Sequence, residues 1–307
     1  MTNDPDYGRN VSFHRLLRSG PRHLVSRLVE GRGTHSALKK SADHLEVAIC
    51  IGNSQPVLLA AAMSPAPEVD EFSIANALRP TPLVRCLTVD LEVPAETEIV
   101  LEGRITQATA PEGPFLDLTG TMDIVREGHV IEIDCVTHRR HPLYQALLPG
   151  GKEHKLLMGL PREPTIYAEV SKVCRCLSVL LTPGSASWLH AVVQIEKRDA
   201  HDGWRAIDAA FRGHNSLKHV VVVDEDIDIY DPSDVEWAIA TRFQAHSDLV
   251  VWEGRPGSSL DPSATHIPGQ KARTTKMGLD ATIPWHTPLG EVRSPEEREA
   301  FKKTKYE

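Results

Sequence analysis

The first half of the chain repeats short apolar segments that are separated by turn residues. Segments rich in β-branched side chains lie at Leu83–Val93, Glu98–Thr106, Leu118–Arg126 and His129–His138. Arg126-Glu127-Gly128 is typical of a turn between the last two segments. We therefore expect short antiparallel strands with tight connections, arranged as a β-barrel or a β-sandwich.

Helical patterns precede these strands. Residues 36–44, Gln55–Met63 and Glu68–Arg79 are predicted helices, the last with acidic residues in its first turn, where the helix dipole favours them. Leu45–Gly52 is predicted as a buried strand. His23–Val29 alternates only in part, so a strand and a short helix both remain open.

The pattern changes after Pro149-Gly150-Gly151-Lys152, which is typical of a domain boundary. Beyond it, strands are predicted at Leu177–Leu181, Trp188–Lys197, Lys218–Val223 and Leu249–Trp252, and helices at Thr165–Arg175, Trp204–Phe211 and Asp231–Phe243. This alternation predicts an α/β domain with parallel strand pairs. The charged segment Ser294–Glu307 is predicted as an exposed helix or a loose tail.

Composition narrows the function classes. The chain has 307 residues, of which 41% are hydrophobic, which is enough for a sizeable core in two domains. A net charge of −8 argues against a nucleic-acid binder, and no apolar run approaches the ~20 residues of a membrane helix. Met1–Asn10 is polar and unlike a signal peptide. Five Cys, mostly in apolar stretches, predict buried reduced thiols and a cytoplasmic protein.

The hexapeptide Glu112-Gly113-Pro114-Phe115-Leu116-Asp117 carries two carboxylates five residues apart, and we expect it at the start of a strand. Side chains five apart face opposite sides of a regular strand. Gly and Pro break that geometry, so both acids can face one cavity. Paired carboxylates in a cavity serve as acid and base when their surroundings favour different protonation states. On spacing alone, a surface turn with two solvated acids is the simpler interpretation.

Further motifs accompany the hexapeptide in a fixed order. The first is Asn10-Val11-Ser12-Phe13-His14-Arg15, before the hexapeptide. After it comes Lys218-His219, which is followed by four valines and then by Asp224-Glu225-Asp226-Ile227-Asp228. The last three are Asp234-Val235-Glu236-Trp237-Ala238, Thr241-Arg242 and Lys276-Met277-Gly278-Leu279-Asp280-Ala281-Thr282. Together with the hexapeptide, this ordered set resembles the UbiD family of decarboxylases, from about residue 10 to about residue 284. The set is specific, although each motif alone is weak.

The resemblance implies an α+β and α/β fold in three parts. Residues 1–155 are expected to form a split β-barrel domain that binds prenylated flavin mononucleotide (prenylated FMN). Residues 156–285 are expected to form an α/β oligomerisation domain, and residues 286–307 a charged tail. The implied activity is reversible, non-oxidative decarboxylation of an aromatic or α,β-unsaturated carboxylic acid. Losing carbon dioxide from such an acid leaves a carbanion, which an electron-sink cofactor delocalises better than any side chain.

By the same resemblance, a cofactor site is implied at Asn10, Val11, Ser12, Phe13, His14, Arg15, Thr34, His35, Met63, Ser64, Glu71 and Lys218. Asn10, His35 and Glu71 are the implied ligands of Mn²⁺ or Mg²⁺ on the flavin phosphate, with K⁺ or Na⁺ nearby. Oxygen ligands with one imidazole suit such a cation. For the carboxylate ligand, Glu68 and Asp70 are close alternatives, and Lys218 has the alternative of a solvated residue at the start of a strand.

The family's catalytic triad maps onto Arg15, Glu112 and Asp117. An arginine beside a carboxylate favours the ionised acid, so Glu112 is expected to orient Arg15. A proton donor requires apolar surroundings, which Phe115 and Leu116 are expected to supply for Asp117. The family usually has Gly where Leu116 stands, which implies a differently shaped pocket.

The implied partners are a small carboxylic acid substrate, a flavin prenyltransferase that supplies the cofactor, and further copies of the chain in a homodimer or higher homo-oligomer. No nucleic acid or membrane partner is expected. Family members usually carry a long segment before the Asn-x-x-x-x-Arg element, whereas nine residues precede Asn10 here. Either the chain is a compact variant or a second subunit supplies that segment. A non-catalytic flavin-binding or assembly subunit is therefore the alternative function.

Overall fold

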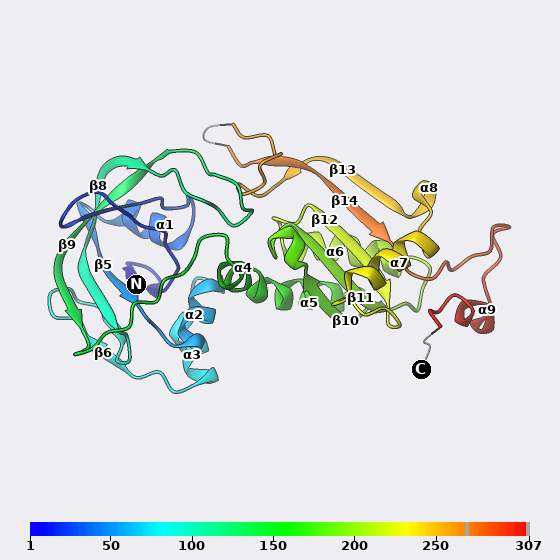
Figure 1. Ribbon diagram of the computed structural model, residues 1–307, viewed down its shortest axis with the longest axis horizontal. Coiled ribbons are helices and arrows are strands. Elements are labelled where there is room, and N and C mark those ends of the chain that lie inside the picture. The colour runs from blue at the N-terminus through cyan, green and yellow to red at the C-terminus, as the bar shows by residue number, and fades with distance from the viewer. Residues whose placement is uncertain (268–269, 305–307) are drawn as a thin grey trace. The chain divides into compact units, whose positions relative to one another are not determined.

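The computed structural model describes residues 1–267 and 270–304 and divides the chain into two compact units (Figure 1). The first unit comprises Met1–Asp117 and Met122–Pro149. The second comprises Leu118–Thr121 and Gly150–Glu307. Among the described residues, no helix is both long and apolar enough to cross a membrane.

The first unit is built on a five-stranded antiparallel sheet. Its strand order is β3 (Leu17–Arg18), β4 (His23–Ser26), β9 (Arg126–His138), β8 (Ile99–Glu112) and β5 (His44–Ile51). Two small hairpins pair β1 (Thr2–Asp4) with β2 (Gly8–Asn10) and β6 (Leu83–Arg85) with β7 (Glu92–Pro94). Figure 1 shows β8 and β9 as the long curved strands of this sheet.

Both faces of this sheet are covered by apolar side chains. Helix α1 (Gly33–Lys40) packs Ala37 and Leu38 against one face, where Ile105 and Ile131 are buried. On the other face, Ala48 and Val100 meet the segment that carries β7. Helices α2 (Gln55–Ala62) and α3 (Glu71–Leu78) form a further small core with each other. Alternation of side chains along a strand allows one sheet to supply two cores.

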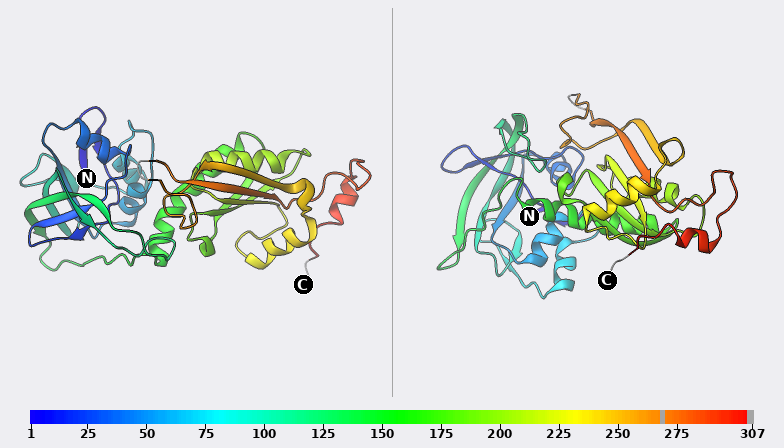
Figure 2. Two further views of the ribbon diagram at one scale, coloured as in Figure 1. Left: turned by 90° about the horizontal axis from the view of Figure 1, so that it is seen from above. Right: turned by 45° about the vertical axis from the view of Figure 1, so that its right-hand side comes forward.

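The second unit is a five-stranded sheet between two helical layers. The strand order is β10 (Arg175–Leu181), β11 (His190–Glu196), β12 (His219–Asp224), β14 (Arg273–Asp280) and β13 (Leu249–Pro256), and the three central strands are parallel. Helices α5 (Glu163–Ser171) and α6 (Asp202–Gly213) cover one face, and α7 (Pro232–Arg242) packs on the other. Figure 2 shows the strands of this sheet alongside its helices.

The remaining helices are short. They are α4 (Lys152–Gly159), α8 (Ala245–Asp248), α9 (Pro295–Glu299) and the 3₁₀ turns η1 (Leu160–Arg162) and η2 (Pro183–Ser185). Ser294 and Glu297 form a capping box at the start of α9, and Asp231 caps α7 by accepting from the Ser233 N–H. The mixed fold and the parallel strand pairs confirm the predicted fold class.

Three local predictions were wrong. Leu118–Arg126 contains turns and an isolated bridge in place of a strand. Gly128 lies inside β9 and not in a turn. Its lack of a side chain lets β9 approach β4, since a Cβ at this position would lie 3.0 Å from the Ser26 carbonyl oxygen. The hexapeptide follows a strand in place of starting one, since Glu112 is the last residue of β8 and Gly113 leaves the sheet with φ +106°.

Strand β14 and helix α4 were not predicted. Gly278 interrupts the β-branched pattern of β14, but the strand requires it, since a Cβ at this position would lie 2.3 Å from Ile207 Cγ2 of α6. A glycine in a strand interior often marks such a close approach.

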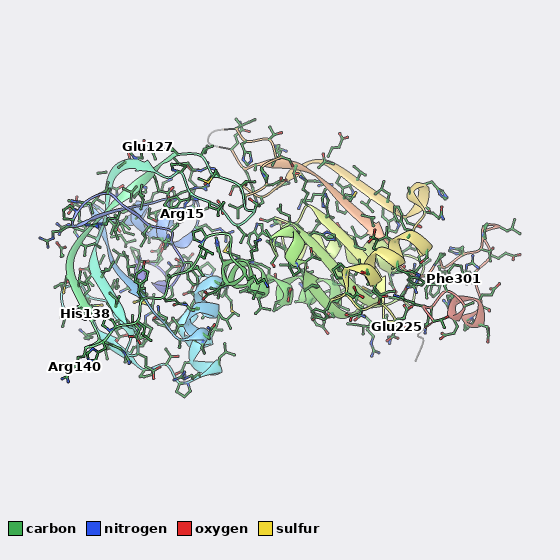
Figure 3. All side chains as sticks on the ribbon, viewed as in Figure 1. Arg15, Glu127, His138, Arg140, Glu225 and Phe301 are labelled. Carbon is green, nitrogen blue, oxygen red and sulfur yellow. The ribbon has the colours of Figure 1, made fainter. Side chains whose placement is uncertain are left out.

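A buried arginine and two lysines attach the C-terminal segment to the second unit. Arg242 of α7 has a side chain that is 0% exposed and pairs with Asp224 at 3.2 Å and Asp226 at 2.5 Å. Its Nη2 also donates to the Phe301 carbonyl oxygen at 3.0 Å. Phe301 lies just after α9 and is labelled in Figure 3. The Lys303 N–H donates to Asp226 at 3.1 Å. The predicted tail is therefore held against the acidic segment that follows β12.

We expect Arg242→Leu to lower the free energy of unfolding of the second unit by about 3–5 kcal/mol, because it leaves two buried carboxylates without their cation. All five Trp residues lie beyond residue 187, so tryptophan fluorescence during urea denaturation reports on this unit. Arg212→Leu is the matched control: Arg212 is half-exposed and pairs with Asp208 at the surface, so we expect a loss of no more than about 1 kcal/mol. Equal losses in the two variants would contradict this account.

Candidate active site

Arg15 and Glu112 form the centre of the site. Glu112 ends β8 and its side chain is 0% exposed. Arg15 lies in the irregular segment between β2 and β3, where its carbonyl oxygen accepts from Ser26 Oγ of β4 at 3.1 Å. The guanidinium donates from Nε to Glu112 Oε1 at 2.7 Å and from Nη2 to Oε2 at 2.9 Å. This bidentate geometry is the strongest form of an arginine–carboxylate pair, and the sequence analysis expected the two residues to pair.

Asp117 approaches the same guanidinium from the loop after β8. Its Oδ2 lies 3.5 Å from Arg15 Nη1, and its side chain is 15% exposed. Phe115 lies between the two acids in sequence and places its ring 4.9 Å from Arg15 Cζ, a cation–π distance. The Gly-Pro corner therefore brings both acids of the hexapeptide to one arginine. Leu116 is 42% exposed, so of the two expected apolar neighbours only Phe115 is partly buried beside the site.

A third acid at this centre was missed by the sequence analysis. Asp123 lies between the hexapeptide and β9, and its Oδ2 accepts from Arg15 Nη2 at 2.9 Å. Its Oδ1 accepts from Arg126 Nη2 at 2.7 Å, and Arg27 Nη1 lies 4.0 Å from Oδ2. Figure 3 labels Arg15 in this unit. Asp123 follows no motif in the sequence, and only the return of the loop to β9 brings it to Arg15.

Charge pairing decides the protonation of this centre. Burial alone would raise the pKa of Asp123, but hydrogen bonds from Arg126 and Arg15 outweigh burial and lower its pKa to about 2. Burial likewise opposes the charge of Arg15, yet Glu112 and Asp123 raise its pKa overall. Arg15 is thus a permanent cation. Among the described residues, its Nη1 faces Asp117 at 3.5 Å in a longer ion pair than those made by Nε and Nη2.

A second polar cluster lies at the start of α1. Asn10 Nδ2 donates to Thr34 Oγ1 at 3.1 Å, and His14 Nε2 lies 3.0 Å from Ser12 Oγ and 3.1 Å from Thr34 Oγ1. Gly33 begins the helix, and a Cβ there would lie 2.5 Å from Asn10 Oδ1. The absence of a side chain at Gly33 therefore lets the Asn10 amide lie against the first turn of α1. Four of the predicted cofactor residues come together here.

Glu71 and His35, the other two predicted metal ligands, each accept a hydrogen bond from a backbone N–H group. Glu71, at the start of α3, is largely buried and accepts from the Val11 N–H at 3.0 Å. Burial raises its pKa. His35 Nδ1 accepts from the Gly31 N–H at 3.3 Å, and burial together with Lys39 lowers the His35 pKa, which favours the neutral imidazole that binds metals.

No group of three or more His, Cys, Asp and Glu side chains suited to a metal occurs among residues 1–267 and 270–304. The predicted set contributes only two side chains of these types, because its third member is an asparagine amide. Metal ligation by Asn10, His35 and Glu71 thus stays a prediction.

The remaining predicted cofactor residues differ in burial, in position and in their partners. Val11 is buried in the small core with α2 and α3, and Phe13 is 40% exposed. Met63 and Ser64 directly follow α2. Lys218 belongs to the second unit, where its Nζ lies 3.0 Å from Asp261 Oδ2 and also donates to Ser263 Oγ. Lys218 is therefore an ion-paired residue just before β12, and its contact with a cofactor phosphate stays a prediction.

Asp123→Asn should remove a pH-dependent contribution to stability. The folded-state pKa of about 2 lies below the ordinary value of 3.8, so this carboxylate stabilises the fold above about pH 4, and the contribution disappears as the pH falls to about 2. The difference corresponds to about 2 kcal/mol at neutral pH. Urea denaturation followed by circular dichroism should show that gap at pH 7 and its closure near pH 2. Asp134→Asn is the control, because Asp134 forms a half-exposed pair with Arg104, and its unfolding free energy should stay close to that of the wild type. A difference between Asp123→Asn and the wild type that does not change with pH would contradict the ion-paired state of Asp123.

Known structures share this fold. The UbiD-class enzyme HmfF from Pelotomaculum thermopropionicum, solved in complex with FMN, superposes with a TM-score of 0.88 at 40% identity and covers 97% of this chain and 68% of its own. An evolved dimeric form of HmfF in complex with prenylated FMN gives 0.83 at 39% identity, covering 96% and 66%. The chain is also 48% identical over 286 residues to anhydromevalonate phosphate decarboxylase of Methanocaldococcus jannaschii, covering 91% of this chain and 66% of that protein.

This chain spans about two thirds of the length of the relatives it matches. Two family models account for nearly all of it. The 3-octaprenyl-4-hydroxybenzoate carboxy-lyase Rift-related domain matches residues 1–152, and the C-terminal domain of the same carboxy-lyase matches residues 155–281. The chain therefore belongs to the UbiD family of carboxy-lyases.

Proposed function

We propose that this protein catalyses the reversible, non-oxidative decarboxylation of an unsaturated carboxylic acid with prenylated FMN. The observation that carries the proposal is the convergence of Glu112, Asp117 and Asp123 on Arg15. A purely structural arginine at this place would be satisfied by its two closest acids. The family's FMN and prenylated FMN complexes support the cofactor.

The side chains divide the chemistry between them. Arg15 binds the substrate carboxylate through Nη1, and Glu112 fixes the plane of the guanidinium by its bidentate pair. Prenylated FMN, when bound, supplies the electron sink for the electron pair of the breaking carbon–carbon bond. Carbon dioxide leaves, and Asp117 donates its proton to the carbon that carried the carboxylate. In the carboxylation direction, Asp117 takes that proton back.

The distance between Asp117 and Arg15 supports the proposed role of Asp117. Asp117 Oδ2 lies 3.5 Å from Nη1, so a substrate carboxylate bound to the same nitrogen would lie beside the Asp117 carboxyl group, where the proposed proton transfer takes place. Asp123 remains ionised, because Arg126 holds it in addition to Arg15.

The cluster at α1 fits the phosphate end of the cofactor. The first N–H groups of a helix lack partners within the helix, and α1 has no acidic residue in its first turn and no side-chain cap at Arg32. Asn10 Oδ1, His35 Nε2 and the Glu71 carboxylate are hard or borderline donors suited to Mn²⁺ or Mg²⁺. We propose that these residues hold a divalent cation on the phosphate, with K⁺ or Na⁺ nearby.

The substrate proposal rests on the archaeal relative. Its name states that it acts on anhydromevalonate phosphate, and a dehydrated mevalonate carries the carbon–carbon double bond that the proposed chemistry requires. We therefore propose an unsaturated aliphatic acid of this kind ahead of an aromatic one. The complete set of Arg15, Glu112 and Asp117 favours an enzyme over the alternative of a non-catalytic subunit.

We expect Asp117→Asn and Glu112→Gln both to inactivate the protein, for different reasons. Asp117→Asn removes the transferable proton, so turnover should fall by about 10²–10⁴-fold with cofactor content unchanged. Glu112→Gln leaves Arg15 with Asp123 as its main partner. It should therefore also lower the free energy of unfolding by about 2 kcal/mol, less than the ~3–5 kcal/mol of a fully isolated buried charge.

Turnover is measured as carbon dioxide release from anhydromevalonate phosphate, and the free energy of unfolding is measured by urea denaturation. Both measurements use protein produced together with a flavin prenyltransferase. Glu127→Gln, at an exposed acid immediately before the buried Gly128 and outside the site, is the control and should match the wild type. Wild-type turnover in Asp117→Asn would overturn the role of Asp117, and an inactive wild-type protein would count against the proposed substrate.

Asn10→Ala and His35→Ala should weaken manganese retention by at least about 10-fold, because each removes one ligand. Elemental analysis and flavin absorbance after gel filtration provide the measurement. Asn3→Ala is the control, because the Asn3 amide donates to the Asp90 carbonyl oxygen at 3.4 Å on the surface, away from the predicted ligands. Unchanged metal and flavin content in both ligand variants would place the cofactor phosphate elsewhere.

A further inference from the structure

Three arginine side chains of the first unit converge on Asp123. Arg15 Nη2 donates to Asp123 Oδ2 at 2.9 Å, and Arg126 Nη2 donates to Oδ1 at 2.7 Å. Arg27 Nη1 lies 4.0 Å from Oδ2, which is beyond hydrogen-bond distance. Both oxygens of Asp123 are therefore taken at short range by the other two arginines. Among the residues that the structure describes, this long contact is the only ion pair of Arg27.

Arg27 carries a charge that its surroundings oppose. Burial lowers the pKa of Arg27, and the neighbouring Arg126 lowers it further, ahead of the opposing effect of Asp123. A guanidinium group stays protonated in proteins, so loss of a proton does not relieve this repulsion. Glu112 pairs with Arg15, and Asp123 pairs with Arg126. Arg27 is thus a partly buried cation that has no carboxylate of its own at short range.

The backbone holds Arg27 at this place. It directly follows β4, between Ser26, which is fully buried, and Leu28, which packs in the core beneath α1. Its side chain is 24% exposed, whereas the side chain of Arg22, just before the same strand, is 67% exposed. An ordinary surface arginine is the simpler interpretation, but such a residue is mostly exposed, as Arg22 is. The fold therefore keeps Arg27 beside the other two arginines and out of bulk water.

Arg27 lies within reach of a small molecule bound to Arg15. The two side chains approach the same Asp123 oxygen, at 2.9 Å from Arg15 Nη2 and 4.0 Å from Arg27 Nη1, so these two nitrogens are at most about 7 Å apart. An acid that carries a second anionic group a few bonds from its carboxylate can contact both arginines. The planar fork of a guanidinium matches carboxylate and phosphate oxygens, and a phosphate has enough oxygens to contact Arg126 as well.

We propose that Arg27, with Arg126 beside it, binds a phosphate ester group of the substrate whose carboxylate is bound by Arg15. The proposal rests on the proposed decarboxylase function and deepens it, because it makes the substrate a phosphorylated unsaturated acid that is recognised at both ends. Arg27 contacts no reacting atom; it determines specificity. A phosphate ester carries a charge of about −1.5 to −2 at neutral pH. An acid with a hydroxyl group in its place leaves the charge of Arg27 unmatched, so the site binds it more weakly.

The first test compares two substrates in cofactor-loaded protein, anhydromevalonate phosphate and unphosphorylated anhydromevalonate. In Arg27→Gln, kcat/KM for the phosphorylated acid should fall by about 10–10²-fold, mostly through KM, because a charge-assisted contact with the substrate is lost. The value for the unphosphorylated acid should change much less, and Arg27→Lys should keep part of the preference for phosphate. Arg22→Gln is the matched control and should resemble the wild type.

Urea denaturation and flavin absorbance exclude two other roles for Arg27. Arg27→Gln should be at least as stable as the wild type, because it removes a repulsion with Arg126. It should also retain a full content of flavin. A loss of stability that lowers kcat/KM equally for both acids would assign Arg27 a structural role. A loss of flavin would assign it to the cofactor phosphate, and either result would overturn the proposal.

Calorimetry separates this proposal from the proposed function, because it measures binding without turnover. Cofactor-loaded Asp117→Asn is titrated with each acid, alone and in combination with Arg27→Gln. We expect the second substitution to raise Kd for the phosphorylated acid by about 10–10²-fold and to leave Kd for the other acid nearly unchanged. No preference for the phosphorylated acid when Arg27 is present would overturn the site. If the wild type binds this acid through Arg27 but releases no carbon dioxide, the decarboxylase proposal fails and the phosphate site stands.

Discussion

The bidentate pair between Arg15 and the buried Glu112 is the interaction on which the site depends. It joins the irregular segment after β2 to the end of β8, and it leaves Nη2 to reach Asp123 and Nη1 to face Asp117. Without Arg15, the buried Glu112 would lose its bidentate partner, whereas Asp123 would keep Arg126. An uncompensated buried carboxylate is costly.

The two chemical roles separate because the three acids have different partners. Asp123 is shared by Arg15 and Arg126 and stays ionised. Glu112 uses both oxygens on one guanidinium. Asp117 has the longest distance to Arg15 and the most exposed side chain of the three, which suits the proposed role of proton donor.

Much of this arrangement was predictable from the sequence. Alternating and β-branched segments predicted most strands, Asp231 predicted the start of α7, and the ordered motifs predicted the family and the convergence of Arg15, Glu112 and Asp117. The failures have tertiary causes. Gly128 was predicted in a turn and the strand around Gly278 was not predicted, yet each glycine lies inside a strand where a neighbouring element comes too close for a Cβ. Asp123 was missed because its role arises from the return of the loop, a tertiary effect that no local pattern records.

Hydrogen exchange into the product tests the central claim most directly, because it isolates proton transfer from carbon dioxide release. The product of the proposed reaction is incubated in deuterated water with cofactor-loaded protein, and mass spectrometry follows deuterium at the carbon that carried the carboxylate. The account predicts exchange in the wild type and none above background in Asp117→Asn, with equal cofactor content. Exchange at the wild-type rate in Asp117→Asn would show that another group supplies the proton and would contradict the account.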